Sequence, residues 1–112
     1  MGYSYELLIT IVNLGFSEEV MDAARQAGAR GGTILHVRGT GSQAEAKFFG
    51  ITIQPEKELV LIVAPKEHRT PIMQAICQRA GLHTPGSGIT FSLPVTAVAG
   101  ISGMTPDDET CN

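Results

Sequence analysis

The chain has 112 residues, of which 43% are hydrophobic and 17% are charged. This composition is typical of one folded domain with a single core. The formal net charge is −3, but three acids lie in the last six residues, which leaves eight acids and eight bases in residues 1–101. A body with balanced charge and only six aromatic residues argues against direct binding of DNA or RNA.

The sequence also bears on location and redox state. No apolar run approaches 18 residues, and Glu6 stands where a secretory signal would carry a basic region. We therefore expect a cytoplasmic protein with no membrane insertion. The two cysteines, Cys77 and Cys111, have no metal-binding spacing and form no disulfide framework, so we expect reduced thiols.

The first predicted strand covers residues 5–12, YELLITIV, whose continuous apolar run suits a strand covered on both faces. A turn at residues 13–15 follows, and Ser17 is expected to cap a helix that Gly28 ends. Asn13 is interpreted as a turn residue, with a catalytic polar group as the alternative. The helix should bury an apolar stripe formed by Val20, Met21, Ala24 and Ala27.

The most informative stretch is GGTILHVRGTGSQ, residues 31–43. Gly31 and Gly32 are expected to adopt positive φ, and residues 33–38 to form a second strand with one side in the core. The glycines of Gly39-Thr40-Gly41 would let backbone amides face a bound anion, although such spacing alone more often marks a plain turn. His36 is interpreted as a packed or interfacial residue rather than a ligand.

Residues 42–58, SQAEAKFFGITIQPEKE, show neither a helical nor a strand period, and we predict a mobile loop. Phe48 and Phe49 either pack at the base of this loop or form a contact surface that orders on binding.

A third strand is predicted at residues 58–64, again apolar on both faces, and ends at Pro65. A second helix begins near Glu67 and ends at Gly81. Cys77 lies beside its apolar side, where a buried structural thiol is expected. The inward-facing residues of this helix are predicted to be Ile72, Met73, Ile76 and Ala80.

The remaining segments are a second glycine-spaced turn at residues 84–88 and a fourth strand from Ile89 to Leu93. Residues 96–101 are predicted to add a short edge segment. Residues 102–112 are predicted to form a flexible acidic tail.

The order strand-helix-strand, repeated twice, predicts an α+β fold: a ferredoxin-like βαββαβ sandwich with both helices on one face of an antiparallel sheet. Two helices cover only one face, yet two of the strands are apolar on both. Leaving those side chains in water would forgo about 1.5 to 3 kcal/mol each. We therefore expect copies of the chain to associate through the open sheet face in a closed ring.

The segments GARGGTILHVRGTGSQ and TPGSGITFSLPV resemble corresponding parts of the PII nitrogen-regulatory signalling proteins, and the resemblance extends over residues 5–101. It implies a ferredoxin-like homotrimer built from a domain of residues 1–101. It also implies that ADP or ATP, with magnesium in some states, binds in clefts between subunits.

The resemblance assigns nucleotide binding to both glycine segments and to the base of the loop between them: Gly31, Gly32, Thr33, Gly39, Thr40, Gly41, Ser42, Gln43, Gly86, Ser87 and Gly88. Gln43 aligns with a glutamine that helps hold the magnesium bridging ATP and 2-oxoglutarate. Lys57 aligns with a lysine that contacts 2-oxoglutarate.

Four residues depart from the family pattern because they stand where the family has cations: Ser42, Ile89, Gly100 and Ser102. Each lost charge-assisted hydrogen bond is worth about 1.5 to 3 kcal/mol, so ATP would bind more weakly unless other cations compensate. The candidates for such compensation are Arg30, Arg38, Lys47 and Lys66. The loop from Gln43 to Glu56 is also short and has no tyrosine, so a switch by tyrosine nucleotidylylation cannot operate there.

The resemblance implies a regulator and not an enzyme, whose loop at residues 40–53 contacts a membrane transporter or a metabolic enzyme. An acylphosphatase-type enzyme is disfavoured because the segment NLGFSEEV has no arginine. A structural trimer with a decayed nucleotide site is a further alternative. So is a metal-binding trimer, although no ligand motif connects its candidates, which are His36, His68, His83 and Cys111.

Overall fold

The computed structural model describes residues 2–38, 46–48, 51–53 and 56–100, with side chains described outside the 46–53 segment. In chain order its elements are β1 (Tyr5–Asn13), α1 (Ser17–Gln26), β2 (Thr33–Arg38), β3 (Ala46–Phe48), β4 (Ile51–Ile53), β5 (Glu56–Pro65), the short 3-10 helix η1 (Lys66–His68), α2 (Arg69–Ala80) and β6 (Gly88–Val95).

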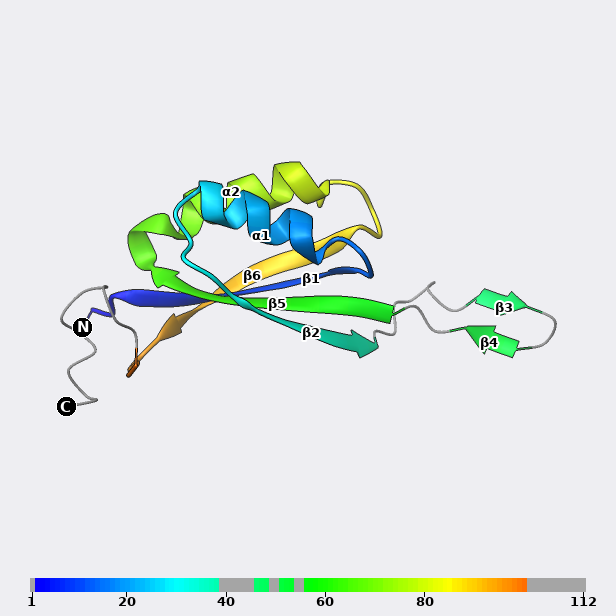
Figure 1. Cartoon of the computed structure of the whole chain (residues 1–112), viewed down its shortest axis with the longest axis horizontal. Helices are drawn as coiled ribbons and strands as arrows, with labels where there is room; N and C mark the ends of the chain where they lie inside the picture. Colours follow the sequence, from blue (N-terminus) through cyan, green and yellow to red (C-terminus); the bar gives the residue numbers. More distant parts are fainter. Residues whose placement is uncertain (1, 39–45, 49–50, 54–55, 101–112) are drawn as a thin grey trace.

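Four strands form one antiparallel sheet in the order β2-β5-β1-β6, and α1 and α2 lie side by side over one of its faces (Figure 1). This is the split βαβ arrangement, so the predicted ferredoxin-like α+β fold is confirmed. The predicted helix endings also hold, because Gly28 and Gly81 both adopt positive φ just beyond α1 and α2.

The core lies between the helices and the sheet. Alternate residues of β1 and β5 are buried, as expected of strands with one face against helices. The apolar stripes predicted for both helices contact this layer, with Ala27, Met73 and Ala80 at its margin. The buried cluster consists of Leu8, Val12, Val20, Met21, Ala23, Ala24, Ala29, Val60, Ile62, Ala64, Ile72 and Ile76.

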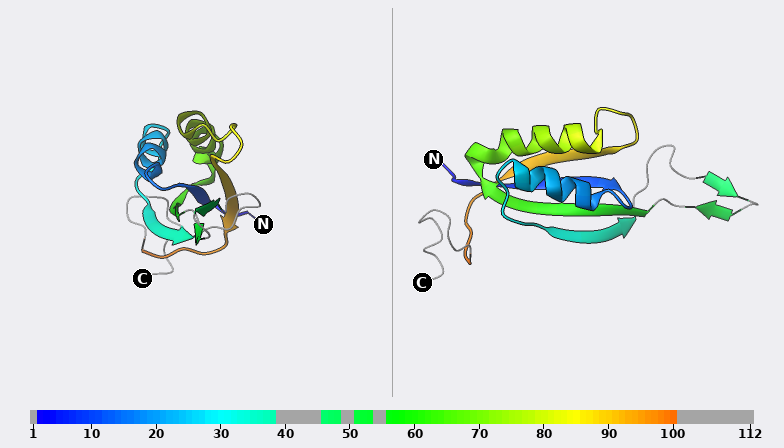
Figure 2. Two further views of the ribbon diagram at one scale, coloured as in Figure 1. Left: turned by 90° about the vertical axis from the view of Figure 1, so that its right-hand side faces the viewer. Right: turned by 45° about the horizontal axis from the view of Figure 1, so that its top comes forward.

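The opposite face of the sheet, called the open face below, is also apolar. Register pairs place nine large side chains in adjacent rows there: Leu7, Ile9, Ile11, Leu59, Leu61, Val63, Ile89, Phe91 and Leu93. In the described part of the chain no helix covers this face, as Figure 2 shows. Ile89, Phe91 and Leu93 keep 54%, 38% and 47% of their surface exposed. The prediction that the central strands are apolar on both faces is therefore confirmed.

The prediction that one side of residues 33–38 joins the core is wrong. Five of these six residues are exposed and Val37 is only half-buried. The reason is that β2 is an edge strand that pairs only with β5 among the described strands. Ile34 lies beside α1 but remains 41% exposed, because one helix flank does not cover the edge.

The predicted positive φ at Gly31 and Gly32 is also wrong, because neither residue has one. Gly32 is required for a different reason. A Cβ there would lie 2.8 Å from the carbonyl oxygen of Leu61, so the absence of a side chain lets the chain enter β2 close to β5.

Ser17 does not cap α1 with its side chain, contrary to the prediction. The acceptor comes from β5 instead: Oε1 of Glu58 accepts hydrogen bonds from the backbone N–H groups of Gly15, at 2.9 Å, and Ser17, at 3.0 Å. A buried carboxylate thus satisfies the free amides at the start of the helix.

Two segment predictions also need correction. Part of the predicted loop at residues 42–58 is a hairpin, in which β3 pairs with β4, and Figure 1 places it beyond the ends of β2 and β5. Residues 96–100 form no strand, so the edge segment predicted at 96–101 is wrong over that range. Residue 101 and the predicted tail at residues 102–112 lie outside the described residues.

Candidate functional site

The second glycine-spaced turn, from Thr84 to Gly88, is held closely against β1. Ser87 donates its backbone N–H to the carbonyl of Thr84 at 3.1 Å, and Gly86 and Gly88 have φ of +82° and +147°. A Cβ at Gly88 would lie 2.4 Å from the carbonyl oxygen of Ile11. Both the backbone conformation and the close approach therefore require glycine at this position.

A polar contact joins this turn to Lys57, the residue predicted to contact 2-oxoglutarate. The ammonium of Lys57 donates to Oδ1 of Asn13 at 2.6 Å, and Nδ2 of Asn13 donates to the carbonyl of Gly86 at 3.2 Å. Asn13 ends β1 and pairs in register with Lys57 of β5. Its side chain therefore does more than form the predicted turn, since it bridges two segments predicted to bind ligands.

Sequence reasoning missed this role of Asn13. Lys57 and Gly86 lie 44 and 73 residues from it along the chain, so no local spacing connects the three. The only sequence signal is a polar residue that follows directly on a long apolar strand.

Within one chain, the two predicted glycine segments lie at opposite edges of the sheet. Gly31, Gly32 and Thr33 lead into β2, whereas the turn from Thr84 to Gly88 leads into β6. Two strands separate β2 from β6, which places these edges about 14 Å apart at the usual spacing of about 4.8 Å between strands. A single chain does not bring these segments together. Gly39, Thr40, Gly41, Ser42 and Gln43 lie outside the described residues.

The candidate replacement cations are spread over the sheet. Arg38, at the end of β2, pairs in register with Glu56 and lies at the same end of the sheet as the Thr84–Gly88 turn. Lys66 follows β5 at the other end, where its Nζ lies 5.1 Å from the ring centre of Tyr3. Ile89, which the sequence resemblance aligns with a cation of the family, is an exposed apolar side chain on the open face. Ser42, Ser102 and the Lys47 side chain are not described.

Glu58 is a buried carboxylate with several partners. Its Oε1 accepts the two backbone N–H groups at the start of α1, and its Oε2 lies 3.1 Å from Nε2 of His36. Burial raises the pKa of Glu58, but hydrogen bonds from Ser17 and Gly15, together with the nearby His36, outweigh this effect and hold the pKa below its ordinary value. In the single chain His36 is not packed in the core, because its side chain is 69% exposed and contacts a buried acid; an interfacial role for it stays a prediction.

Glu6 is a second buried carboxylate, 2% exposed, near the other end of the sheet. A hydrogen bond from the Tyr3 hydroxyl is the largest influence and lowers the pKa of Glu6; burial opposes it, while Ser92 and Arg69 add to the lowering. Arg69 Nη1 lies 3.6 Å from its Oε2. Both buried acids are thus stabilised in the ionised form by partners within the chain.

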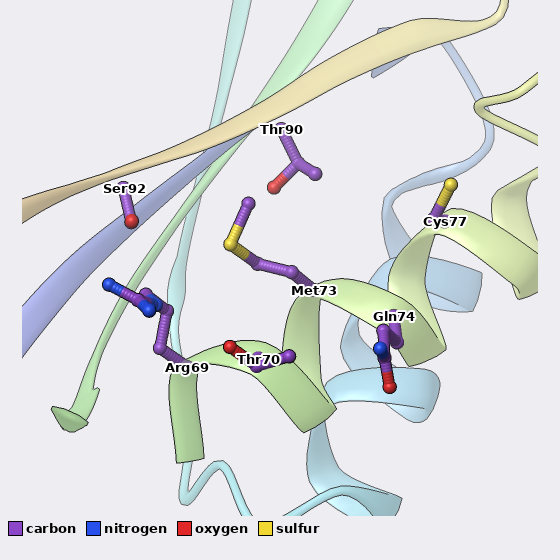
Figure 3. Close-up of a pocket in the computed structure, with 7 residues that line it drawn as sticks. All are labelled: Arg69, Thr70, Met73, Gln74, Cys77, Thr90 and Ser92. Atoms are coloured by element: carbon purple, nitrogen blue, oxygen red, sulfur yellow. The ribbon is translucent and has the colours of Figure 1, made fainter. Parts of the chain in front are cut away.

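A groove of about 500 Å³ lies between α2 and β6 (Figure 3). Met73 and Thr90 point toward each other across it, while Gln74 points away. Cys77 lines the groove and is only half-buried, so the prediction of a buried structural thiol is wrong as to burial. Among the described residues, none of those predicted to bind nucleotide lines this groove. Its lining consists of Arg69, Thr70, Met73, Gln74, Cys77, Thr90 and Ser92.

The described residues include neither a candidate metal centre nor a candidate membrane-spanning helix. They contain no group of three or more His, Cys, Asp or Glu side chains placed to hold a metal ion. None of the described helices has the length and apolar character that crossing a membrane requires.

Comparisons with known proteins place this fold in a family. Residues 5–104 match the family described as nitrogen regulatory protein P-II. Among solved structures, the chain is similar to the PII protein of Arabidopsis thaliana bound to citrate, with a TM-score of 0.69 and 25% sequence identity over 88% of this chain and 84% of that one. No curated protein matches the chain. The family match covers most of the sequence and agrees with the observed topology, and the chain therefore belongs to the nitrogen regulatory protein P-II family.

Proposed function

We propose that this protein is a homotrimeric signal-transduction regulator that binds an adenine nucleotide, ADP or ATP, in clefts between its subunits and controls a partner protein. Proteins of its family are regulators rather than enzymes, form trimers and contact partner proteins. The proposal extends those general properties to this chain.

One observation carries the proposal: the two glycine segments lie at opposite edges of a sheet whose open face is apolar. Association through the open face would bury side chains such as Ile89, Phe91 and Leu93, each worth about 1.5 to 3 kcal/mol when fully covered. In a closed ring, every subunit uses the same two different surfaces to contact its two neighbours. Here those surfaces would be the two edges of the sheet, β2 and β6. The β2 edge of one copy would then meet the β6 edge of the next and complete a site that one chain lacks.

The proposed nucleotide site combines two walls. One subunit would supply Gly31, Gly32 and Thr33 together with the segment from Gly39 to Gln43, and its neighbour would supply Gly86, Ser87 and Gly88. Glycine-rich backbone brings amide groups close to phosphate oxygens, and such amides compensate in part for missing cations. Gln43 would approach the magnesium ion that accompanies the nucleotide.

A small polycarboxylate is proposed as the second ligand, with Lys57 as its cation. The Arabidopsis thaliana relative binds citrate, which shows that this fold accepts such an anion in at least one member. In this chain the Lys57 ammonium lies at the end of the open face, in register with Asn13. We propose 2-oxoglutarate as the corresponding ligand.

The partner would be contacted through the loop at residues 40–53. Its described part, the β3–β4 hairpin, lies beyond the sheet, where another protein can approach it (Figure 1). We propose a partner in nitrogen metabolism or membrane transport and a cytoplasmic site of action. Nucleotide binding can control this contact only by favouring one arrangement of the loop over another.

Titration calorimetry with ADP and ATP tests the nucleotide half of the proposal. We expect micromolar binding that is lost in Ser87→Glu, because a carboxylate in the second glycine turn repels phosphate. Gln74→Glu is the matched control, since it adds the same charge on the exposed side of α2. Absence of heat and of any thermal shift for the unaltered protein at millimolar nucleotide would contradict the proposal and favour a structural trimer.

A further inference from the structure

Three separate parts of the chain meet at the side chain of Asn13. Lys57 is the second residue of β5, Asn13 ends β1, and Gly86 lies in the turn between α2 and β6. The Lys57–Asn13 contact of 2.6 Å is a short, charge-assisted hydrogen bond. The Asn13–Gly86 contact of 3.2 Å is an ordinary one.

The amide of Asn13 fits both contacts in one orientation. Lysine has donors and no acceptor, and a carbonyl has only acceptors, so the residue between them must accept on one side and donate on the other. An aspartate would accept from Lys57 but has no hydrogen for the Gly86 carbonyl. A leucine of similar size would satisfy neither group.

We propose that Asn13 is a positioning residue that couples the Lys57 ammonium, and a carboxylate ligand bound to it, to the glycine turn from Thr84 to Gly88. The proposal rests on the ligand sites proposed above. Its new element is that the two sites are connected inside one chain, through this one amide.

The coupling has a predictable sign. An ammonium has three donors, so Lys57 can keep Asn13 Oδ1 and still donate to a carboxylate. Because the hydrogen bond to Asn13 already restricts the Lys57 side chain, that side chain loses less conformational entropy when a carboxylate binds. A carboxylate that orders Lys57 further also orders Asn13 and its bond to Gly86. A carboxylate on Lys57 should therefore reduce the motion of the Thr84–Gly88 turn of the same chain through Asn13.

Hydrogen exchange of the Ser87 amide reports on this link without any ligand, because that amide bonds to Thr84 within the turn. We expect Asn13→Leu and Lys57→Met each to speed its exchange about three- to tenfold, the change expected from losing about one hydrogen bond. The double variant should be no faster than the faster single variant. Unchanged Ser87 exchange in Lys57→Met, or effects that multiply in the double variant, would overturn the proposal.

Ligand titrations separate this inference from the proposed function. With citrate and 2-oxoglutarate as probes, Asn13→Leu should weaken carboxylate binding severalfold, and Asn13→Asp should abolish it because its charge neutralises the ammonium. Asn13→Gln, which keeps both kinds of group, should restore part of the Ser87 protection. If the unaltered protein binds neither probe nor nucleotide, the proposed function fails, while the exchange experiment still decides whether Asn13 connects Lys57 to the turn.

Discussion

Glu58 and Ser17 are 41 residues apart in the chain, yet the Glu58 carboxylate accepts the backbone N–H of Ser17 at 3.0 Å. This contact fixes the start of α1 to β5, one of the two inner strands of the sheet. The same carboxylate also contacts His36 on the edge strand β2, so this one buried acid of β5 connects α1, β5 and β2.

Removing the charge of Glu58 should destabilise the fold. Glu58→Gln weakens two hydrogen bonds to backbone amides, and we expect a loss of about 1 to 3 kcal/mol in the free energy of unfolding. Urea denaturation followed by circular dichroism measures it at one fixed protein concentration. Glu56→Gln, an exposed residue of the same strand, is the control and should change stability by less than about 0.5 kcal/mol. Equal effects of the two variants would contradict the capping role.

Glu6 and Glu58 should make the free energy of unfolding decrease at acidic pH. Both have a pKa lowered by folding, so the stability that they contribute is fully present above the ordinary glutamate pKa of about 4.3 and is lost as pH falls through the lower folded value. We expect the urea midpoint to fall steeply below about pH 4.3. The double variant with glutamine at both positions should show a shallower fall. An equally steep fall in that variant would assign the acid sensitivity to other groups.

Substitution at Gly88 should be costly. Gly88→Ala combines a φ of +147° with a Cβ 2.4 Å from the Ile11 carbonyl oxygen, and we expect a loss of about 2 to 4 kcal/mol. Gly31→Ala is the control, because nothing lies within 4 Å of its Cβ and its φ is not positive. Thermal denaturation of both variants measures the difference. A tolerated Gly88→Ala would show that the turn can move away from β1.

A charge on the open face should prevent self-association. Leu93→Glu places a carboxylate among the apolar rows, and we expect a monomer in sedimentation velocity, because an unpaired charge cannot be buried without a large cost. Leu14→Glu is the matched control: Leu14 is 50% exposed against 47% for Leu93, but it lies in the turn between β1 and α1. A Leu93→Glu protein that sediments like the unaltered chain would exclude this face as the interface.

The sequence was sufficient for the order of the main elements and for much of the core. Continuous apolar runs marked β1 and β5, and the helix stripes with their terminal glycines marked α1 and α2, because these signals depend on neighbours along the chain. The β2 strand shows the limit: its residues were located correctly, but their exposure depends on the strand's place at the sheet edge.

The contacts of the candidate site were beyond local reasoning. Ser17 carried a typical capping side chain, yet the acceptor at the helix start comes from Glu58. Asn13 looked like a turn residue, yet its partners lie in β5 and in the turn before β6. Both errors arise because hydrogen bonds between distant segments are fixed by the fold and leave no spacing in the sequence.

The most direct test of the account is the mass of the unaltered protein in sedimentation equilibrium at micromolar concentration, without ligand. We predict three times the chain mass of 11.9 kDa, because the apolar open face needs neighbouring copies to cover it and proteins of this family form trimers. A single species of one chain mass would contradict the account, since no second subunit would then complete the proposed nucleotide cleft.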